Sequence, residues 1–190
     1  MFKVVKVSLI AIGALLFATG GALAAEKRHA HTHVHGAAEM SIVVEGKKIT
    51  VDFRSPAEGV MGFEHEARSD ADIKKRDTTM KIIKERFGEM VLFDKKLGCA
   101  YQPGEISLVR TDGGDTKEPK PAKGDSKKSG EHREVRATHH FICEQDPAGS
   151  RVRFAVTKMF SGISELKVQV LSGAKQSGVT IRRDKGDAAL

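Results

Sequence analysis

Residues 40–56 read MSIVVEGKKITVDFRSP and contain the pattern that decides the fold. Apolar residues take every second position on both sides of Gly46, and Pro56 ends the run. These alternating residues are Met40, Ile42, Val44, Ile49, Val51 and Phe53. A period of two is typical of a β-strand with one buried face. The stretch therefore predicts a β-hairpin that turns near Gly46 and stops at Pro56.

A helical pattern follows the hairpin over residues 69–90. Its apolar positions recur at steps of seven, three and four, at Ile73, Met80, Ile83 and Phe87. Lys and Arg fill the positions between them, which is typical of an amphipathic helix whose apolar stripe packs into the core. Ser69 is the expected N-cap residue, with Asp72 as its capping-box partner.

The composition changes at about residues 111–134, where Gly, Pro and charges of both signs replace the large apolar residues. Such a segment buries too little surface to offset its ordering entropy, so we expect a disordered insertion there. Strand-like segments return at 135–143, 151–160, 165–171 and 178–183. Together these features predict an α+β fold, with a mostly antiparallel sheet, one main amphipathic helix and a disordered charged insertion.

The first 24 residues have the three parts of a secretory signal peptide. Lys3 and Lys6 form a positive start, an apolar core runs from Ser8 to Ala18, and Ala22-Leu23-Ala24 forms a cleavage site. The apolar run is shorter than the roughly 20 residues that span a membrane, so no stable membrane insertion is expected. We expect cleavage after Ala24, which leaves residues 25–190 as one exported domain. A lipid anchor is not expected, because it would need a cysteine just after the cleavage site, and the two cysteines of the chain are Cys99 and Cys143.

The formal net charge of the chain is +7, and its basic residues are spread along the sequence. The chain has no Trp and one Tyr, so it offers few rings on which bases could stack. An exported destination also separates it from nucleic acid. We therefore do not expect nucleic-acid binding.

Cys99 and Cys143 are the two cysteines of the chain. In an exported protein they predict a disulfide, with two separate buried thiols or a metal-thiolate pair as alternatives. The disulfide would close a loop of about 45 residues and contribute roughly 3–4 kcal/mol in the chain-entropy model. It is also expected to hold the two ends of the insertion together.

Half of the eight histidines lie within HAHTHVH, residues 29–35, at His29, His31, His33 and His35. In an extended chain, side chains two residues apart point the same way, about 7 Å apart, so two imidazoles can converge on one ion. Neutral imidazole suits zinc, copper and nickel. His33 and His35 lead directly into the first strand, whereas His29 and His31 lie nearer the mature N-terminus. The alternative is a polar leader that binds no metal.

Further ligands are expected from residues 63–66, Phe-Glu-His-Glu, because a closed zinc site takes about four ligands. His65 lies there between two carboxylates. Glu64 or Glu66 can bind the ion directly, or orient His65 by accepting its other N–H.

Three histidines later in the chain are weaker candidates. His139 shares the apolar face of residues 135–143, so we expect it to be a core residue. The side chain of His140 points to the opposite face of the same strand. His132 falls in the expected insertion and would supply at most a weak ligand.

The sequence HVHG at 33–36, the strand pair and SPAEGVMGFEHEA at 55–67 together resemble the ZrgA-like family of bacterial periplasmic zinc-binding proteins. Cys99, the hydrophilic insertion, FIC at 141–143 and MFSGISELKVQV at 159–170 follow in the family's order. The resemblance therefore covers nearly the whole mature chain.

This resemblance implies a periplasmic protein that binds Zn²⁺ and assists high-affinity zinc uptake and homeostasis. The expected partners are the zinc ion and the periplasmic components of a zinc ABC transporter. By this resemblance, the expected metal ligands are His33, His35, Glu64 and His65. His29 and His31 are additional candidate ligands that are particular to this chain. The family's insertion is commonly rich in His, Asp and Glu. Here it is rich in lysine, so we do not expect it to hold several ions.

Two alternatives remain at this level. Copper or nickel could replace zinc, since intrinsic affinities rank copper above zinc and only the resemblance favours zinc. A zinc hydrolase would need an open metal position and a general base, for which Glu64 and Glu66 are candidates. The sequence has no HExxH motif. We therefore expect a periplasmic binding protein and not an enzyme.

Overall fold

Two ranges of the chain, residues 36–111 and 132–190, are described by a computed structural model and belong to the same structural unit. The expected signal peptide, the four histidines of residues 29–35 and residues 112–131 lie outside these ranges. The elements in chain order are β1 (Ala37–Glu45), β2 (Lys48–Pro56), α1 (Ala57–Met61), α2 (Asp70–Arg86), the 3-10 helix η1 (Phe87–Glu89), β3 (Val91–Phe93), the 3-10 helix η2 (Lys95–Leu97), β4 (Ala100–Arg110), β5 (Arg133–Ile142), β6 (Arg151–Phe154), α3 (Val156–Met159), β7 (Glu165–Ser172), β8 (Lys175–Arg182) and β9 (Asp187–Ala189).

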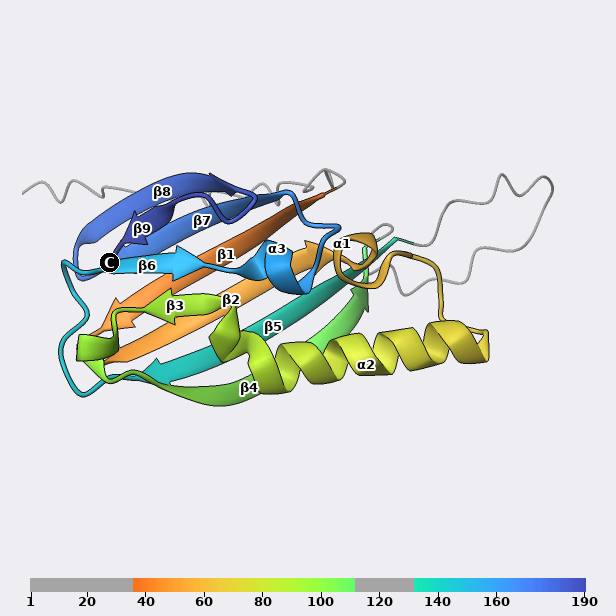
Figure 1. Ribbon diagram of the computed structural model, residues 1–190, viewed down its shortest axis with the longest axis horizontal. Helices are drawn as coiled ribbons and strands as arrows, with labels where there is room; N and C mark the ends of the chain where they lie inside the picture. Colours follow the sequence, from red (N-terminus) through yellow and green to blue (C-terminus); the bar gives the residue numbers. More distant parts are fainter. Residues whose placement is uncertain (1–35, 112–131) are drawn as a thin grey trace, which may run out of the picture. The chain divides into compact units, whose positions relative to one another are not determined.

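The larger sheet has six strands in the order β4-β5-β2-β1-β7-β8 (Figure 1). All neighbouring pairs in it are antiparallel except β1 and β7, which run parallel. A smaller antiparallel sheet has the order β3-β6-β9. With α2 as the long helix of the described residues, this arrangement confirms the predicted α+β class and the mostly antiparallel sheet.

The hairpin predicted from residues 40–56 is strands β1 and β2. Glu45 pairs with Lys48, so the turn consists of two residues, and Gly46 has a φ of +57° that favours glycine. All six alternating apolar side chains are buried in one hydrophobic cluster, namely Met40, Ile42, Val44, Ile49, Val51 and Phe53. The period-two pattern thus identified both the strands and their buried face.

The start of helix α2 also follows its prediction. The Ser69 hydroxyl accepts a hydrogen bond from the Asp72 N–H at 3.1 Å and donates one to the Asp72 carboxylate at 2.7 Å. The apolar stripe is shorter than predicted. Ile83 and Phe87 are buried and Met80 packs against the core, but Ile73 is only half-buried. The buried residues of α2, Thr79 and Ile83, lie in its C-terminal half, so the core reaches only that half.

The predicted insertion, at about residues 111–134, overlaps the start of strand β5 at its C-terminal end. Strand β4 continues to Arg110 and strand β5 begins at Arg133, so Arg133 and Glu134 belong to the sheet. The two strands pair up to Arg110 opposite Arg133. Strand pairing, which a local composition window cannot detect, orders these charged residues.

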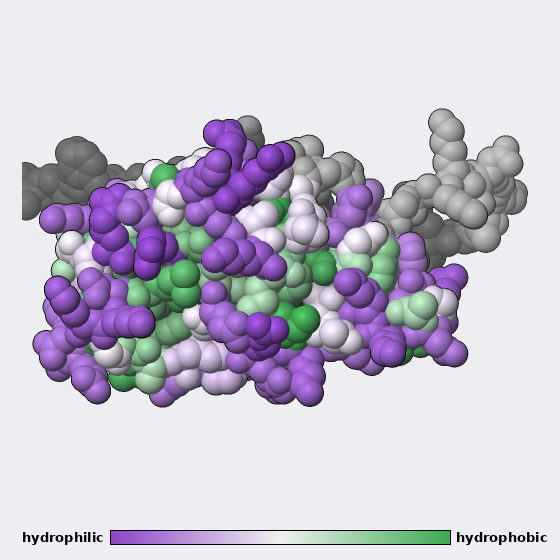
Figure 2. Space-filling view, in the orientation of Figure 1, coloured by the Kyte–Doolittle hydropathy of each residue, from purple (hydrophilic) through white to green (hydrophobic). Residues whose placement is uncertain are grey.

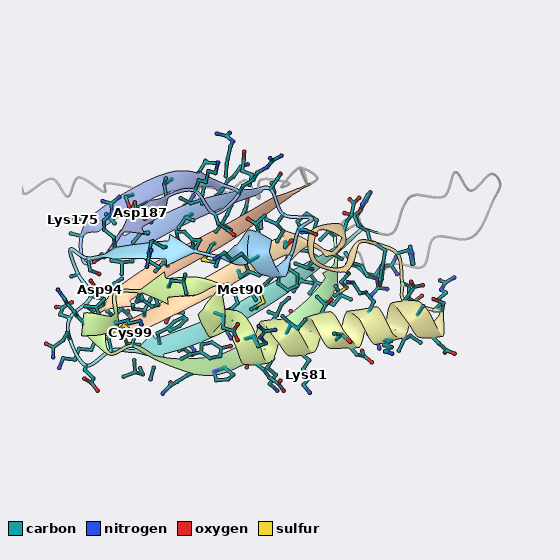
Figure 3. The ribbon with its side chains drawn as sticks, viewed as in Figure 1. Lys81, Met90, Asp94, Cys99, Lys175 and Asp187 are labelled. Atoms are coloured by element: carbon teal, nitrogen blue, oxygen red, sulfur yellow. A yellow bond between two sulfur atoms is a disulfide. The ribbon has the colours of Figure 1, made fainter. Side chains whose placement is uncertain are left out.

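The predicted disulfide joins Cys99 to Cys143. It continues the β4–β5 pairing just beyond Ala100 and Ile142. Figure 3 places Cys99 near Asp94, at the end of the sheet drawn on the left. The bond does not hold the ends of the insertion together directly, because the length of the β4–β5 pair separates them. The backbone ladder between the two strands performs that role.

The surface of the described residues is mainly polar, with small apolar areas between charged side chains on the face shown in Figure 2. Its exposed large apolar side chains are Ile142, Leu171 and Val179. Among the described residues, no helix combines the length and the apolar character needed to cross a membrane.

Candidate metal site

The six strands of the larger sheet all have one end on the same side of the sheet. The start of β1 lies beside the start of β7. The start of β5 lies between the end of β2 and the end of β4. The pairs at this end are Ala37 with Glu165, Pro56 with Glu134, and Arg133 with Arg110. We call it the Gly36 end of the sheet, because Gly36 immediately precedes β1. The opposite end, with Cys99 and Cys143, is the disulfide end.

Gly36 fixes the point at which the N-terminal histidines join the sheet. Its carbonyl oxygen accepts hydrogen bonds from the Ser164 N–H at 2.8 Å and the Glu165 N–H at 3.0 Å. Its φ is +77°, and a Cβ atom there would lie 3.1 Å from the Ser164 hydroxyl oxygen. Glycine meets both constraints. Consecutive Cα atoms are about 3.8 Å apart, so His35 joins the sheet here, although His33 and His35 themselves lie outside the described residues.

The loop that contains Glu64 and His65 leaves strand β2 at the same end. Helix α1 follows Pro56 directly and ends at Gly62, whose φ is +84° and whose N–H binds the Glu58 carbonyl. The strand that this loop follows, β2, and the start of β1 therefore meet at one end of the sheet, where the end of β2 pairs with β1.

Within this loop, His65 is exposed and its ring is held on two sides. It stacks on the Phe63 ring at a centroid distance of 4.8 Å, and its Nδ1 lies 3.0 Å from the backbone carbonyl oxygen of Glu66. When Nδ1 carries the proton, it donates to that carbonyl, and Nε2 keeps a lone pair for a metal. The group that orients His65 is thus a backbone carbonyl and not a carboxylate.

The two carboxylates beside His65 have other partners. Arg68 donates two hydrogen bonds to the Glu66 carboxylate, at 3.1 and 3.0 Å, and Arg133 lies 3.9 Å from it. The Arg68 hydrogen bonds hold the pKa of Glu66 below its usual value. The Glu64 carboxylate contacts Nδ1 of His132. The Glu66 carboxylate is therefore paired with arginines, and the Glu64 carboxylate contacts a histidine from a distant part of the chain.

The sequence placed His132 in the insertion as at most a weak ligand, whereas it lies directly before strand β5. Its backbone carbonyl accepts hydrogen bonds from the Thr111 N–H at 2.9 Å and the Thr111 hydroxyl at 3.1 Å, which extend the pairing of β4 and β5 by one step. Its contact with Glu64 spans 68 residues of sequence. The available signal was its place one residue before a strand, but local periodicity does not identify the neighbour of that strand.

The other two described histidines lie within strand β5. His139 is fully buried, stacks on Phe87 at 4.3 Å, and accepts a hydrogen bond at Nδ1 from the Gly104 N–H at 3.1 Å. Burial, and to a smaller extent the neighbouring His140, lowers the pKa of His139 to about 4. His140 is on the opposite face, with Nδ1 3.2 Å from the Thr50 hydroxyl. The prediction that His139 is a core residue is confirmed.

Within residues 36–111 and 132–190, no three His, Cys, Asp or Glu side chains lie close enough together to hold a metal ion. Described donors at the Gly36 end are the His65 ring, the Glu64 carboxylate and the His132 ring. A complete site there needs ligands from other residues, and the chain that enters at Gly36 carries histidines at positions 33 and 35.

Imidazole and carboxylate groups are donors that transition metals accept, but the described ones do not complete a site by themselves. The chain belongs to the ZrgA family of zinc uptake proteins, whose family model matches residues 32–190. This confirms the resemblance seen in the sequence and gives the chain a role in zinc uptake at the level of the family. The match includes His33 and His35 but begins after His29 and His31. A search of curated proteins found no match.

Proposed function

We propose that this protein is a periplasmic accessory protein that captures Zn²⁺ and supports its high-affinity uptake. Membership of a zinc uptake family supports the metal and the process. The disulfide fits an extracytoplasmic location, and the expected signal peptide supports export to the periplasm. The observation that carries the proposal is the shared position of the Glu64-His65 loop and the start of β1 at the Gly36 end.

The proposed ligands are His33, His35 and His65, with Glu64 contributing as a ligand or as a group that orients one. Three imidazoles and a carboxylate match the number and type of donors that zinc takes. Gly36 is bonded to the Ser164-Glu165 backbone, so the chain that carries the two N-terminal histidines reaches β1 from the Gly36 end. His31 and His29 precede them and provide additional imidazoles along the path of the ion.

This arrangement supports binding and release instead of a reaction. His65 is exposed, so an ion has direct access to it from solvent. A hydrolase would need a carboxylate available as general base beside the metal. The Glu66 carboxylate is held by Arg68 and Arg133, and the Glu64 carboxylate contacts His132. The zinc would then pass to the periplasmic components of a zinc ABC transporter, the proposed partners.

The identity of the metal is tested on protein taken from the periplasm and purified without a nickel column. Elemental analysis should find zinc bound to the mature chain, residues 25–190. Copper or nickel in place of zinc would support the alternative metals, and the absence of any bound metal would overturn the proposed function.

The position of the site is tested by zinc titration against a competing chelator. The double variant His33→Ala/His35→Ala should bind zinc much more weakly than the wild type, because it removes two of about four ligands. His140→Ala removes a histidine from the middle of the sheet and is the matched control, with unchanged affinity expected. Equal affinity in the wild type and the double variant would refute the proposed site.

A further inference from the structure

Strand β8 is one of the two outer strands of the larger sheet, and no described strand pairs with its outer side (Figure 1). It runs for 8 residues, pairs with β7 without a register shift, and exposes all of its residues except Ile181. A regular, exposed outer strand offers a row of unpaired backbone N–H and C=O groups to another strand.

The other outer strand, β4, is protected against such pairing. Its register shifts between Gln102 and Glu105. Pro103 has no N–H, and the Gly104 N–H donates to Nδ1 of His139 at 3.1 Å. Bulges and prolines are common means by which a protein blocks the edge of a sheet. Strand β8 has neither, so the two edges of the sheet differ in what they can bind.

The pairing of β8 with β7 determines which backbone groups point outward. In an antiparallel pair, residues that hydrogen-bond to the neighbouring strand alternate with residues that do not. Arg183, just beyond β8, donates its N–H to the Ser164 carbonyl at 3.0 Å and continues the register of this pair. The odd-numbered residues of β8 therefore bond to β7. The N–H and C=O groups of Gln176, Gly178 and Thr180 point outward.

Gly178, in the middle of these three residues, is not required by its own chain. Its φ is not positive, and a Cβ there would meet only the Val168 carbonyl oxygen, at an ordinary 3.8 Å. A glycine inside a strand weakens the strand and often marks a position that another backbone approaches closely. The adjacent Val179 is 36% exposed and offers an apolar contact. Both features fit a further strand along β8.

The side chains around this strand carry positive charge. Lys167, Lys175, Arg183 and Lys185 are exposed and form no ion pair with a described residue. Figure 2 shows hydrophilic side chains projecting at the upper edge, where Figure 1 places β8. We call strand β8 with these four cations the β8 edge.

The acidic side chains near the β8 edge have other partners. Glu165 lies 3.0 Å from Arg182, and Asp187 pairs with Arg151. The Asp184 carboxylate accepts two backbone N–H groups at the start of α3, at 3.1 and 3.2 Å. The positive charge therefore favours a negatively charged strand. It disfavours a second copy of this chain, whose own β8 edge carries the same charge.

We propose that the β8 edge is an interaction surface that binds an extended acidic segment of a partner protein as an additional strand. Main-chain hydrogen bonds to Gln176, Gly178 and Thr180 provide the attachment, and acidic side chains that face the four cations select the partner. The surface uses none of the proposed zinc ligands, so this inference does not depend on the proposed function.

The test uses the isotopically labelled mature chain, residues 25–190, and a synthetic peptide of about nine alternating Val and Thr residues with Glu at both ends. Hydrogen exchange measured by NMR should be fast at the Gln176, Gly178 and Thr180 amides of the free chain. Saturating peptide should slow it by about tenfold or more. A matched peptide with Lys in place of Glu should give no protection.

Two variants and a control separate the backbone from the charge. Thr180→Pro removes an outward N–H without breaking the ladder to β7, so peptide binding should be lost, whereas Thr180→Ala should bind as the wild type does. Lys175→Glu should weaken binding of the acidic peptide by about fivefold and keeps the proposal testable if Thr180→Pro does not fold.

The inference is overturned if the acidic peptide does not bind, or if the acidic and basic peptides bind equally well. Slow exchange at the three amides in the free chain would also overturn it. Sedimentation then identifies the occupant: the mass of a dimer indicates a second copy, and the mass of a monomer indicates another segment of the same chain.

Discussion

A histidine lies near each end of strand β5, and the two side chains have opposite environments. At the Gly36 end, His132 is half-exposed and its Nδ1 contacts the Glu64 carboxylate. Toward the disulfide end, His139 is fully buried against Phe87 and accepts a backbone N–H at Nδ1. Its Nε2 has no hydrogen-bond partner among the described residues.

This difference shows that the environment and not the residue type decides the role. At the Gly36 end, the Glu64 carboxylate contacts the imidazole of His132, whose side chain is about half exposed. Toward the disulfide end, the ring fills space in the core, where burial lowers its pKa to about 4. We therefore expect changes near the disulfide end to affect stability and changes at the Gly36 end to affect zinc binding.

Removal of the disulfide should have the largest effect on stability. Replacing Cys99 and Cys143 by serine releases a bond between residues separated by 44 positions. The free energy of unfolding should fall by about 3–4 kcal/mol, as measured by urea denaturation. Zinc affinity of the folded variant should stay at the wild-type value. A loss of zinc affinity as large as that of His33→Ala/His35→Ala would contradict the separation of the two ends.

Acid should destabilise the protein through His139. Its pKa is about 4 in the folded chain and about 6.5 when exposed, so the unfolded chain binds the extra proton between these values. Stability is therefore complete above pH 6.5 and falls as the pH drops toward 4. Between pH 7 and 4.5 the loss from this residue should be about 2.5 kcal/mol.

His139→Gln is the matched variant for this measurement, because its amide oxygen can accept the Gly104 N–H but does not titrate. Urea denaturation at the two pH values should show a smaller acid loss for this variant than for the wild type, by about that amount. The same acid loss in both proteins would show that His139 is not the group responsible.

Two glycines at opposite ends of strand β1 give a finer comparison. Gly36 and Gly46 both have positive φ, so replacement by alanine should destabilise each by about 1–2 kcal/mol. A Cβ at Gly36 also meets the Ser164 hydroxyl, whereas nothing lies within 4 Å at Gly46. Gly36→Ala should therefore lower zinc affinity by displacing His35, and Gly46→Ala should not. Equal zinc affinities in the two variants would argue against Gly36 as the anchor of the site.

Tyr101→Phe should have the smallest effect. Burial raises the pKa of Tyr101 to about 12, so its hydroxyl remains protonated and donates to the Lys84 carbonyl at 2.6 Å. Loss of this hydrogen bond should cost about 1 kcal/mol in urea denaturation, with no change in a zinc titration. A clear loss of zinc affinity would link the core near His139 to the metal site.

Local patterns predicted much of the fold. Alternation identified the β1–β2 hairpin, helical spacing with a capping box identified the start of α2, and the face of His139 identified it as a core residue. The parallel pairing of β1 with β7 and the position of β5 beside β2 depend on strand order, which local patterns do not contain. The Glu64–His132 contact follows from that order, so local patterns could not predict Glu64 as the neighbour of His132.

The central claim, that zinc binds at the Gly36 end, is tested most directly by anomalous diffraction at the zinc edge from crystals of the mature protein grown with Zn²⁺. We expect a peak beside the start of β1 and the loop at residues 63–66. Its ligands should include imidazole nitrogens at about 2.0–2.1 Å, among them that of His65. The absence of a peak there, with zinc bound instead beside His140 or at the disulfide end, would contradict the account.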